Sequence, residues 1–101
     1  MTDNRIVVIV DEDLEELIPG FLENRNKDVQ VLRDAMGNDD FSRLKSIGHS
    51  LKGVGGGYGF DGLSEIGAKI EIAARASDMN AVRELIDAMA DYLGRVDVVY
   101  E

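Results

Sequence analysis

Apolar residues recur at intervals of three and four over most of the chain, and this spacing predicts four consecutive helices. The first is expected to run from Pro19 to Gly37, because proline suits the first turn of a helix and glycine its C-terminal end. The other three are expected to be capped in turn by Asn38-Asp39-Asp40, by Asp61 and by Ser77-Asp78. Connections of about three to six residues place consecutive helices antiparallel. The sequence therefore predicts an all-α fold, an antiparallel four-helix bundle that takes up all 101 residues as a single domain.

Two segments at the ends of the chain depart from the helical spacing. Ile6–Val10 is a run of β-branched residues, which is typical of a short strand. Residues 11–16 contain five acids and predict a short N-terminal helix, because carboxylates are favourable at the positive end of a helix dipole. Val96–Tyr100 alternates in part, and the pattern leaves open whether it pairs with Ile6–Val10 in a short β ladder.

The composition excludes several classes of function. The net charge of −9 has the wrong sign for phosphate backbones or anionic lipid, so neither nucleic acid nor a membrane is an expected partner. The chain has no cysteine and one histidine, so no metal site, disulfide or thiol nucleophile is expected. Its longest apolar run has five residues, too few for a membrane span or a signal-peptide core, which favours a cytoplasmic location.

The single histidine, His49, falls on the side of the second predicted helix that faces away from the apolar stripe. Lys45 and Lys52 lie on the same side, one helical turn before and after it. Residues 41–60 contain three cations and no acid, which gives a local charge of +3 in a chain of net charge −9. The imidazole therefore lies in the one positive stretch of an acidic protein.

Glycines are frequent beside this histidine, although each glycine inside a helix costs roughly 0.5–1 kcal/mol relative to alanine. Close packing between helices explains Gly48 and Gly55. Gly53 and Gly56 are instead predicted to face solvent on the side of His49. Bare backbone at these positions would let a large partner bring a phosphoryl group to the imidazole.

The sequence HSLKG at residues 49–53, with a glycine ten residues after the histidine and Leu63 beyond it, resembles the H-x-L-K-G motif of the histidine-containing phosphotransfer (HPt) domain. The stretch 49–60 is closest to the phosphotransfer domain of chemotaxis histidine kinases. The resemblance implies a four-helix bundle with an exposed histidine on its second helix. That histidine would accept a phosphoryl group from one receiver-domain aspartate and pass it to another.

The resemblance also implies a role for each matching residue. His49 would be the phospho-acceptor, and Lys52 would neutralise the phosphate. Glu71 would accept a hydrogen bond from the imidazole Nδ1–H and leave Nε2 as the nucleophile, although a solvated surface acid is the alternative. Arg75, one turn further on, would add a positive charge. The expected partner-docking residues are Lys45, Gly53 and Gly56.

We therefore expect a monomeric phosphocarrier without autokinase activity, because no ATP-binding region fits in 101 residues. Its expected partners are a response-regulator receiver domain and a histidine kinase or hybrid kinase. No cofactor of its own is expected, and Mg²⁺ is expected on the receiver domain. Two alternatives remain: a module that docks on a receiver or kinase without transfer, and an enzyme that uses His49 as a general base. The intact pair of His49 and Lys52 argues against the first, and the lack of an accompanying nucleophile or pocket argues against the second.

Overall fold

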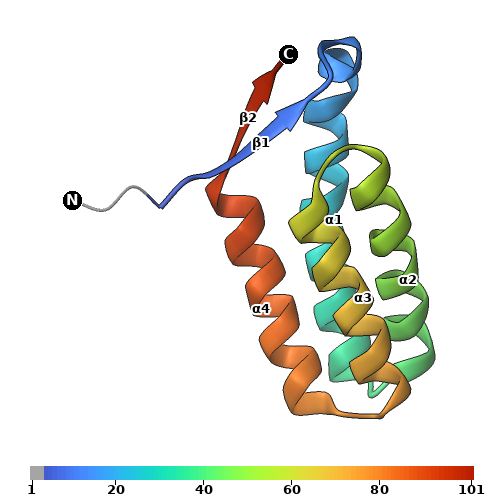
Figure 1. Ribbon diagram of the computed structural model, residues 1–101. Helices are drawn as coiled ribbons and strands as arrows, with labels where there is room; N and C mark the ends of the chain where they lie inside the picture. The colour runs from blue at the N-terminus through green and yellow to red at the C-terminus, as the bar shows by residue number, and fades with distance from the viewer. Residues whose placement is uncertain (1–3) are drawn as a thin grey trace.

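In the computed structural model, which describes residues 4–101, four helices lie side by side and form a bundle (Figure 1). The predicted all-α, antiparallel bundle is confirmed, and the short N-terminal helix is a 3₁₀ helix. The elements in chain order are β1 (Ile6–Val10), η1 (Glu12–Leu17), α1 (Ile18–Gly37), α2 (Phe41–Gly57), α3 (Asp61–Arg75), α4 (Met79–Arg95) and β2 (Val96–Tyr100).

The two terminal segments pair as parallel strands at one end of the bundle (Figure 1). The chain reverses direction at α1 and again at each following helix. After four helices, α4 and its continuation β2 therefore run in the same direction as β1. Ile6 lies opposite Val96, and Val10 lies opposite Tyr100. The side chain of Val10 is buried in the core. The β pairing that the sequence pattern left open is therefore present.

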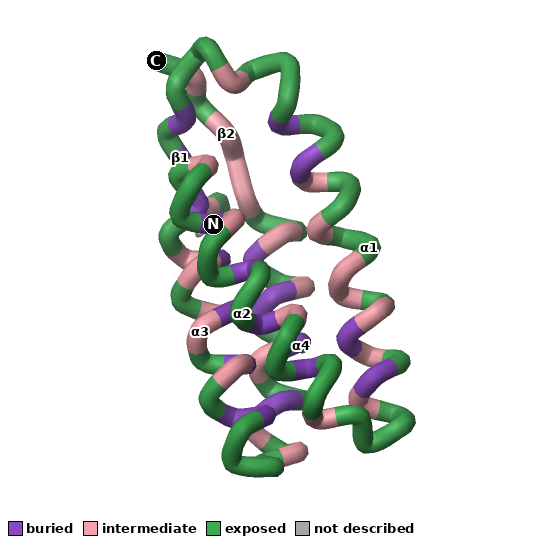
Figure 2. The backbone as a smooth tube through the Cα atoms, turned by 90° about the vertical axis from the view of Figure 1, so that its right-hand side faces the viewer, coloured by how far each residue is buried: buried purple, intermediate pink, exposed green. Residues whose placement is uncertain are grey.

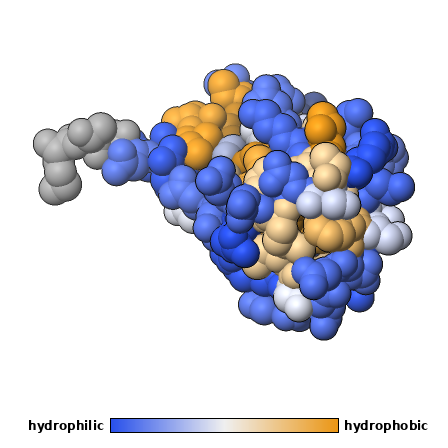
Figure 3. Space-filling model, turned by 90° about the horizontal axis from the view of Figure 1, so that it is seen from below, coloured by the Kyte–Doolittle hydropathy of each residue, from blue (hydrophilic) through white to orange (hydrophobic). Residues whose placement is uncertain are grey.

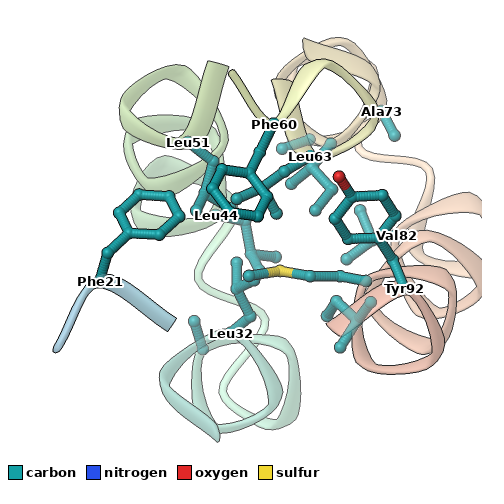
Figure 4. Packing of buried hydrophobic residues seen from close by; sticks show 14 of the residues in the cluster. Phe21, Leu32, Leu44, Leu51, Phe60, Leu63, Ala73, Val82 and Tyr92 are labelled. Atoms are coloured by element: carbon teal, nitrogen blue, oxygen red, sulfur yellow. The ribbon is translucent and has the colours of Figure 1, made fainter. Parts of the chain in front are cut away.

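The core lies between the four helices and extends under β1, and the buried stretches of the chain face inward in Figure 2. Figure 4 shows the ring of Phe60 among aliphatic side chains from the surrounding helices. Burial raises the pKa of the Tyr92 phenol above its usual value, and a backbone hydrogen bond at Leu63 opposes that shift. No polar or charged residue among residues 4–101 is fully buried. The largest fully buried side chains are Phe60, Ile18, Leu32, Leu44, Leu51, Leu63, Ile70, Ile86, Met89, Val10 and Val82.

Aspartate caps begin two of the helices as predicted. The side chains of Asp40 and Asp78 accept hydrogen bonds from backbone N–H groups in the first turns of α2 and α4. The predicted cap at Asp61 is wrong, because Asp61 is the first residue of α3 and Phe60 occupies the cap position without a side-chain hydrogen bond. The ring of Phe60 is fully buried, and its backbone N–H donates a hydrogen bond to the Gly55 carbonyl. These contacts place the start of α3 one residue earlier than predicted.

Glycines bring the backbones of α2 and α3 into close contact. A Cβ atom added at Gly48 would lie 2.7 Å from the backbone nitrogen of Glu71 and 2.8 Å from the carbonyl oxygen of Gly67. One added at Gly55 would lie 2.7 Å from the backbone nitrogen of Ser64. The packing role predicted for Gly48 and Gly55 is confirmed, and Gly67 is its counterpart on α3. This close approach determines which residues of α3 lie beside His49.

The face of the bundle that is seen from below is mainly polar (Figure 3). Seen from below, hydrophilic side chains surround an apolar area at that end (Figure 3). Within residues 4–101, no helix is long and apolar enough to cross a membrane.

Candidate functional site

His49 lies in the middle of α2, and its side chain is 73% exposed. Leu44 and Leu51, on the opposite side of the same helix, are fully buried. The apolar spacing of α2 therefore turns the imidazole away from the core, as the sequence predicts. An imidazole with this exposure is accessible to a second protein.

Glu71 on α3 contacts the imidazole from one side. Its Oε2 atom lies 3.1 Å from Nδ1 of His49, and its side chain is only 15% exposed. The alternative of a freely solvated surface acid at Glu71 is therefore wrong. In a neutral imidazole the nitrogen that faces a carboxylate carries the hydrogen, so Nδ1–H donates to Oε2 and Nε2 keeps its lone pair. In this tautomer Nε2 is the ring nitrogen whose lone pair is available for reaction.

Arg75 contacts the same carboxylate from the other side. Its Nη2 atom lies 3.4 Å from Oε2 of Glu71, and its side chain is 65% exposed. Arg75 follows Glu71 by one helical turn, a spacing at which side chains on a helix meet. The imidazole, the carboxylate and the guanidinium thus form a chain of contacts in which one oxygen is shared.

Lys52 lies one turn after His49, and its side chain is exposed on the same side of α2. Its backbone carbonyl accepts a hydrogen bond from the hydroxyl of Ser64 on α3, at 2.7 Å. Within residues 4–101, no acidic side chain forms an ion pair with Lys45 or Lys52. The positive charges beside His49 are therefore not neutralised within the described part of the chain.

Gly53 and Gly56 are exposed, as predicted. A Cβ atom at Gly53 would have no neighbour within 4 Å, and one at Gly56 would meet only the Ser64 hydroxyl, at 3.7 Å. Neither glycine is required by packing. Lys45 lies one helical turn before His49 on α2. Its side chain lines a shallow pocket of about 260 Å³ together with Arg75.

The acidic residues do not gather into a further site. No group of three or more histidine, cysteine, aspartate or glutamate side chains within residues 4–101 has a geometry that holds a metal ion. Ser64 and Gly67 are parts of the site region that sequence reasoning missed. Gly67 carries a weak signal in the sequence, since it is a glycine inside a predicted helix, whereas Ser64 carries none.

A protein-family model described as "Hpt domain" matches residues 16–98. The chain belongs to the Hpt family. Comparisons with curated proteins and with solved structures gave no match. Hpt domains are phosphocarriers rather than autokinases, and they interact with receiver domains and kinases. Membership of the Hpt family supports a histidine phosphotransfer role in a phosphorelay. The particular resemblance of residues 49–60 to the phosphotransfer domain of chemotaxis histidine kinases stays a prediction.

Proposed function

We propose that this Hpt protein carries phosphoryl groups between receiver-domain aspartates through Nε2 of His49. The observation that carries the proposal is the 3.1 Å contact between Nδ1 of His49 and Oε2 of Glu71, on an imidazole that is 73% exposed. This contact places the hydrogen on the nitrogen that faces the protein. The unprotonated nitrogen then faces the solvent, from which a partner approaches.

The proposed transfer needs no proton from the chain. The Nε2 lone pair attacks the phosphorus of an aspartyl phosphate, the P–N bond forms, and the P–O bond breaks so that its electron pair leaves with the aspartate. Nδ1 keeps its hydrogen, and the ring becomes cationic while it faces the Glu71 carboxylate. The reverse sequence returns the phosphoryl group to a second aspartate. In this proposal the receiver domain supplies Mg²⁺, which stabilises charge on the phosphoryl oxygens.

The surface around His49 fits an acidic partner. Lys45 and Lys52 lie one turn to either side of the imidazole and have no ion-pair partner within residues 4–101. Gly53 and Gly56 leave the backbone bare on the same side. A receiver domain that presents its phosphorylated aspartate and neighbouring acids would meet complementary charge here. We propose that the Hpt protein docks as a monomer on receivers and on a histidine kinase or hybrid kinase.

The decisive experiment is a transfer assay in two steps. Phosphoramidate, a small donor that needs no docking surface, should load one acid-labile, alkali-stable phosphate per chain, because the chain has a single histidine. The loaded protein is then mixed with a panel of receiver domains and Mg²⁺. Passage of the phosphate to at least one receiver supports the carrier role. Tight binding to a receiver without transfer in either direction would favour the docking module instead.

Gly56→Arg is expected to block receivers without disabling the histidine. The arginine would stand two turns from His49 on the docking side, where a disrupted interface centre loses at least about 2 kcal/mol, or roughly 30-fold in receiver-dependent transfer. Reaction with phosphoramidate should be unchanged. Gly94→Arg is the matched control, because a Cβ atom at Gly94 on α4 also has no neighbour within 4 Å. Equal receiver-dependent rates in the two variants would mean that the docking side is wrongly placed.

Lys52→Ala is expected to slow phosphorylation of His49 or shorten the life of the phosphohistidine by about three- to tenfold, since a nearby cation stabilises a phosphoryl dianion. The free energy of unfolding should change by less than about 1 kcal/mol, because an exposed charge contributes little to stability. Lys27→Ala, at an exposed lysine of α1, is the control for a lost positive charge. If Lys52→Ala lowered stability strongly and left the rates unchanged, Lys52 would have a structural role only.

A further inference from the structure

One carboxylate oxygen connects three residues of the site. Oε2 of Glu71 lies 3.1 Å from Nδ1 of His49 and 3.4 Å from Nη2 of Arg75. We propose that Arg75 is a positioning residue for His49. It holds the Glu71 carboxylate in the orientation in which Oε2 meets Nδ1, and so it keeps Nε2 as the unprotonated nitrogen.

A second contact at the Glu71 carboxylate helps to hold its side chain in this orientation. Glutamate has three rotatable side-chain bonds, so contacts at the carboxylate help to select its rotamer. The side chain is 15% exposed, and the imidazole that it contacts is 73% exposed and free on its outer side. The guanidinium of Arg75 offers a positive charge and an N–H donor to this carboxylate, with Nη2 3.4 Å from Oε2. Since Arg75 contacts the same oxygen as Nδ1, it favours the one rotamer in which both contacts form.

The inference deepens the proposed function and rests on it only for the effect on phosphoryl transfer. The tautomer of the free imidazole is a property of the chain alone and needs no partner. A failure of the positioning role and a failure of the phosphocarrier role can therefore be told apart.

Docking is the rival explanation for Arg75. Its side chain also lines the shallow pocket that contains Lys45, and it is 65% exposed. A purely docking arginine would affect the reaction with receivers and leave the imidazole unchanged. A positioning arginine would change the tautomer and the reaction with phosphoramidate, which needs no docking surface.

The test is ¹⁵N NMR of the imidazole, whose two nitrogen signals report the tautomer directly. The signals are unambiguous because His49 is the only histidine. In Arg75→Ala we expect the ratio of the Nδ1–H to the Nε2–H tautomer to fall by about two- to fivefold, since an exposed ion pair holds its partner only weakly. Phosphorylation by phosphoramidate should slow in proportion to the fraction of the Nδ1–H tautomer that is lost. Arg75→Lys, which keeps a cation one turn after Glu71, should restore most of the tautomer ratio and most of the phosphorylation rate. Arg83→Ala, at an exposed arginine of α4, should change neither.

The same substitution in a Glu71→Ala protein tests whether Arg75 acts on the tautomer through the Glu71 carboxylate. In Glu71→Ala, the further change Arg75→Ala should leave the tautomer ratio unaltered. An equal shift in both backgrounds would overturn the proposal, because Arg75 would then act on the imidazole directly. An unchanged tautomer in Arg75→Ala with loss of receiver-dependent transfer would also overturn it and assign Arg75 to docking. A shifted tautomer in a protein that never accepts phosphate would support the positioning role and refute the proposed function.

Discussion

His49→Gln is expected to abolish acid-labile phosphorylation while the bundle stays folded. No other imidazole exists in the chain, so no other residue can form a phosphohistidine. The side chain is 73% exposed, and substitutions at such positions usually change the free energy of unfolding by no more than about 0.5 kcal/mol. Glutamine also keeps an amide N–H group that can donate to Glu71, so the carboxylate does not lose every partner. The measurements are phosphate incorporation from phosphoramidate and from a phosphorylated receiver, beside a urea unfolding curve.

The stability in acid and in alkali of any phosphate that remains on His49→Gln shows whether the assignment of His49 holds. Phosphoserine is stable in acid, so acid-stable label in His49→Gln would be a side reaction and would leave the assignment intact. Acid-labile, alkali-stable label in the variant at the wild-type level would instead refute His49 as the acceptor. The matched control is Lys27→Gln, which introduces the same side chain at an exposed position of α1 and should keep phosphoramidate labelling.

The position of His49 could be predicted from the sequence because it depends on one helix alone. Once apolar residues such as Leu44 and Leu51 define the buried side of α2, a residue on the opposite side must face solvent. The exposure of Gly53 and Gly56 follows from the same periodicity. The four helices were predictable for a similar reason, since their apolar spacing and end signals are local.

The partners of His49 could not be derived from periodicity, because they lie on another helix. The spacing of α3 places Glu71 at the edge of its apolar stripe, which is compatible with a solvated acid as well as with a contact to His49. The distance and register between α2 and α3 decide between these outcomes. Both are determined by backbone contacts at Gly48 and Gly67, and no single-helix pattern contains that information.

The terminal strands and the start of α3 illustrate the same limit. The β-branched run of Ile6–Val10 predicts a strand, but its pairing with Val96–Tyr100 depends on where four intervening helices bring the chain ends. At α3, the local preference of aspartate for a cap predicted Asp61. Burial of the Phe60 ring, a tertiary effect, places the cap one residue earlier.

Two alanine substitutions in the same helix are expected to have opposite effects on stability. Gly48→Ala would place a Cβ atom 2.7 Å from the backbone nitrogen of Glu71 and 2.8 Å from the carbonyl of Gly67, and neither backbone atom can move without shifting α3. Overpacking of this kind costs about 1–3 kcal/mol. Gly53→Ala would place its Cβ atom in open space and should stabilise the bundle by about 0.5–1 kcal/mol, because alanine is the better helix former.

The same pair links the packing of the helices to the chemistry of the site. Since the atom nearest to the new methyl group of Gly48→Ala belongs to Glu71, relief of the clash moves the carboxylate away from His49. We therefore expect the folded fraction of Gly48→Ala to react more slowly with phosphoramidate, whereas Gly53→Ala should react as the wild type does. Urea unfolding of both variants gives the free energies, and labelling below the unfolding transition gives the rates. Gly67→Ala tests the contact from the other helix, and its effect should be less than additive with that of Gly48→Ala because the two share one interface. Wild-type stability in both Gly48→Ala and Gly67→Ala would show that α2 and α3 separate at little cost and that these glycines do not determine where Glu71 lies.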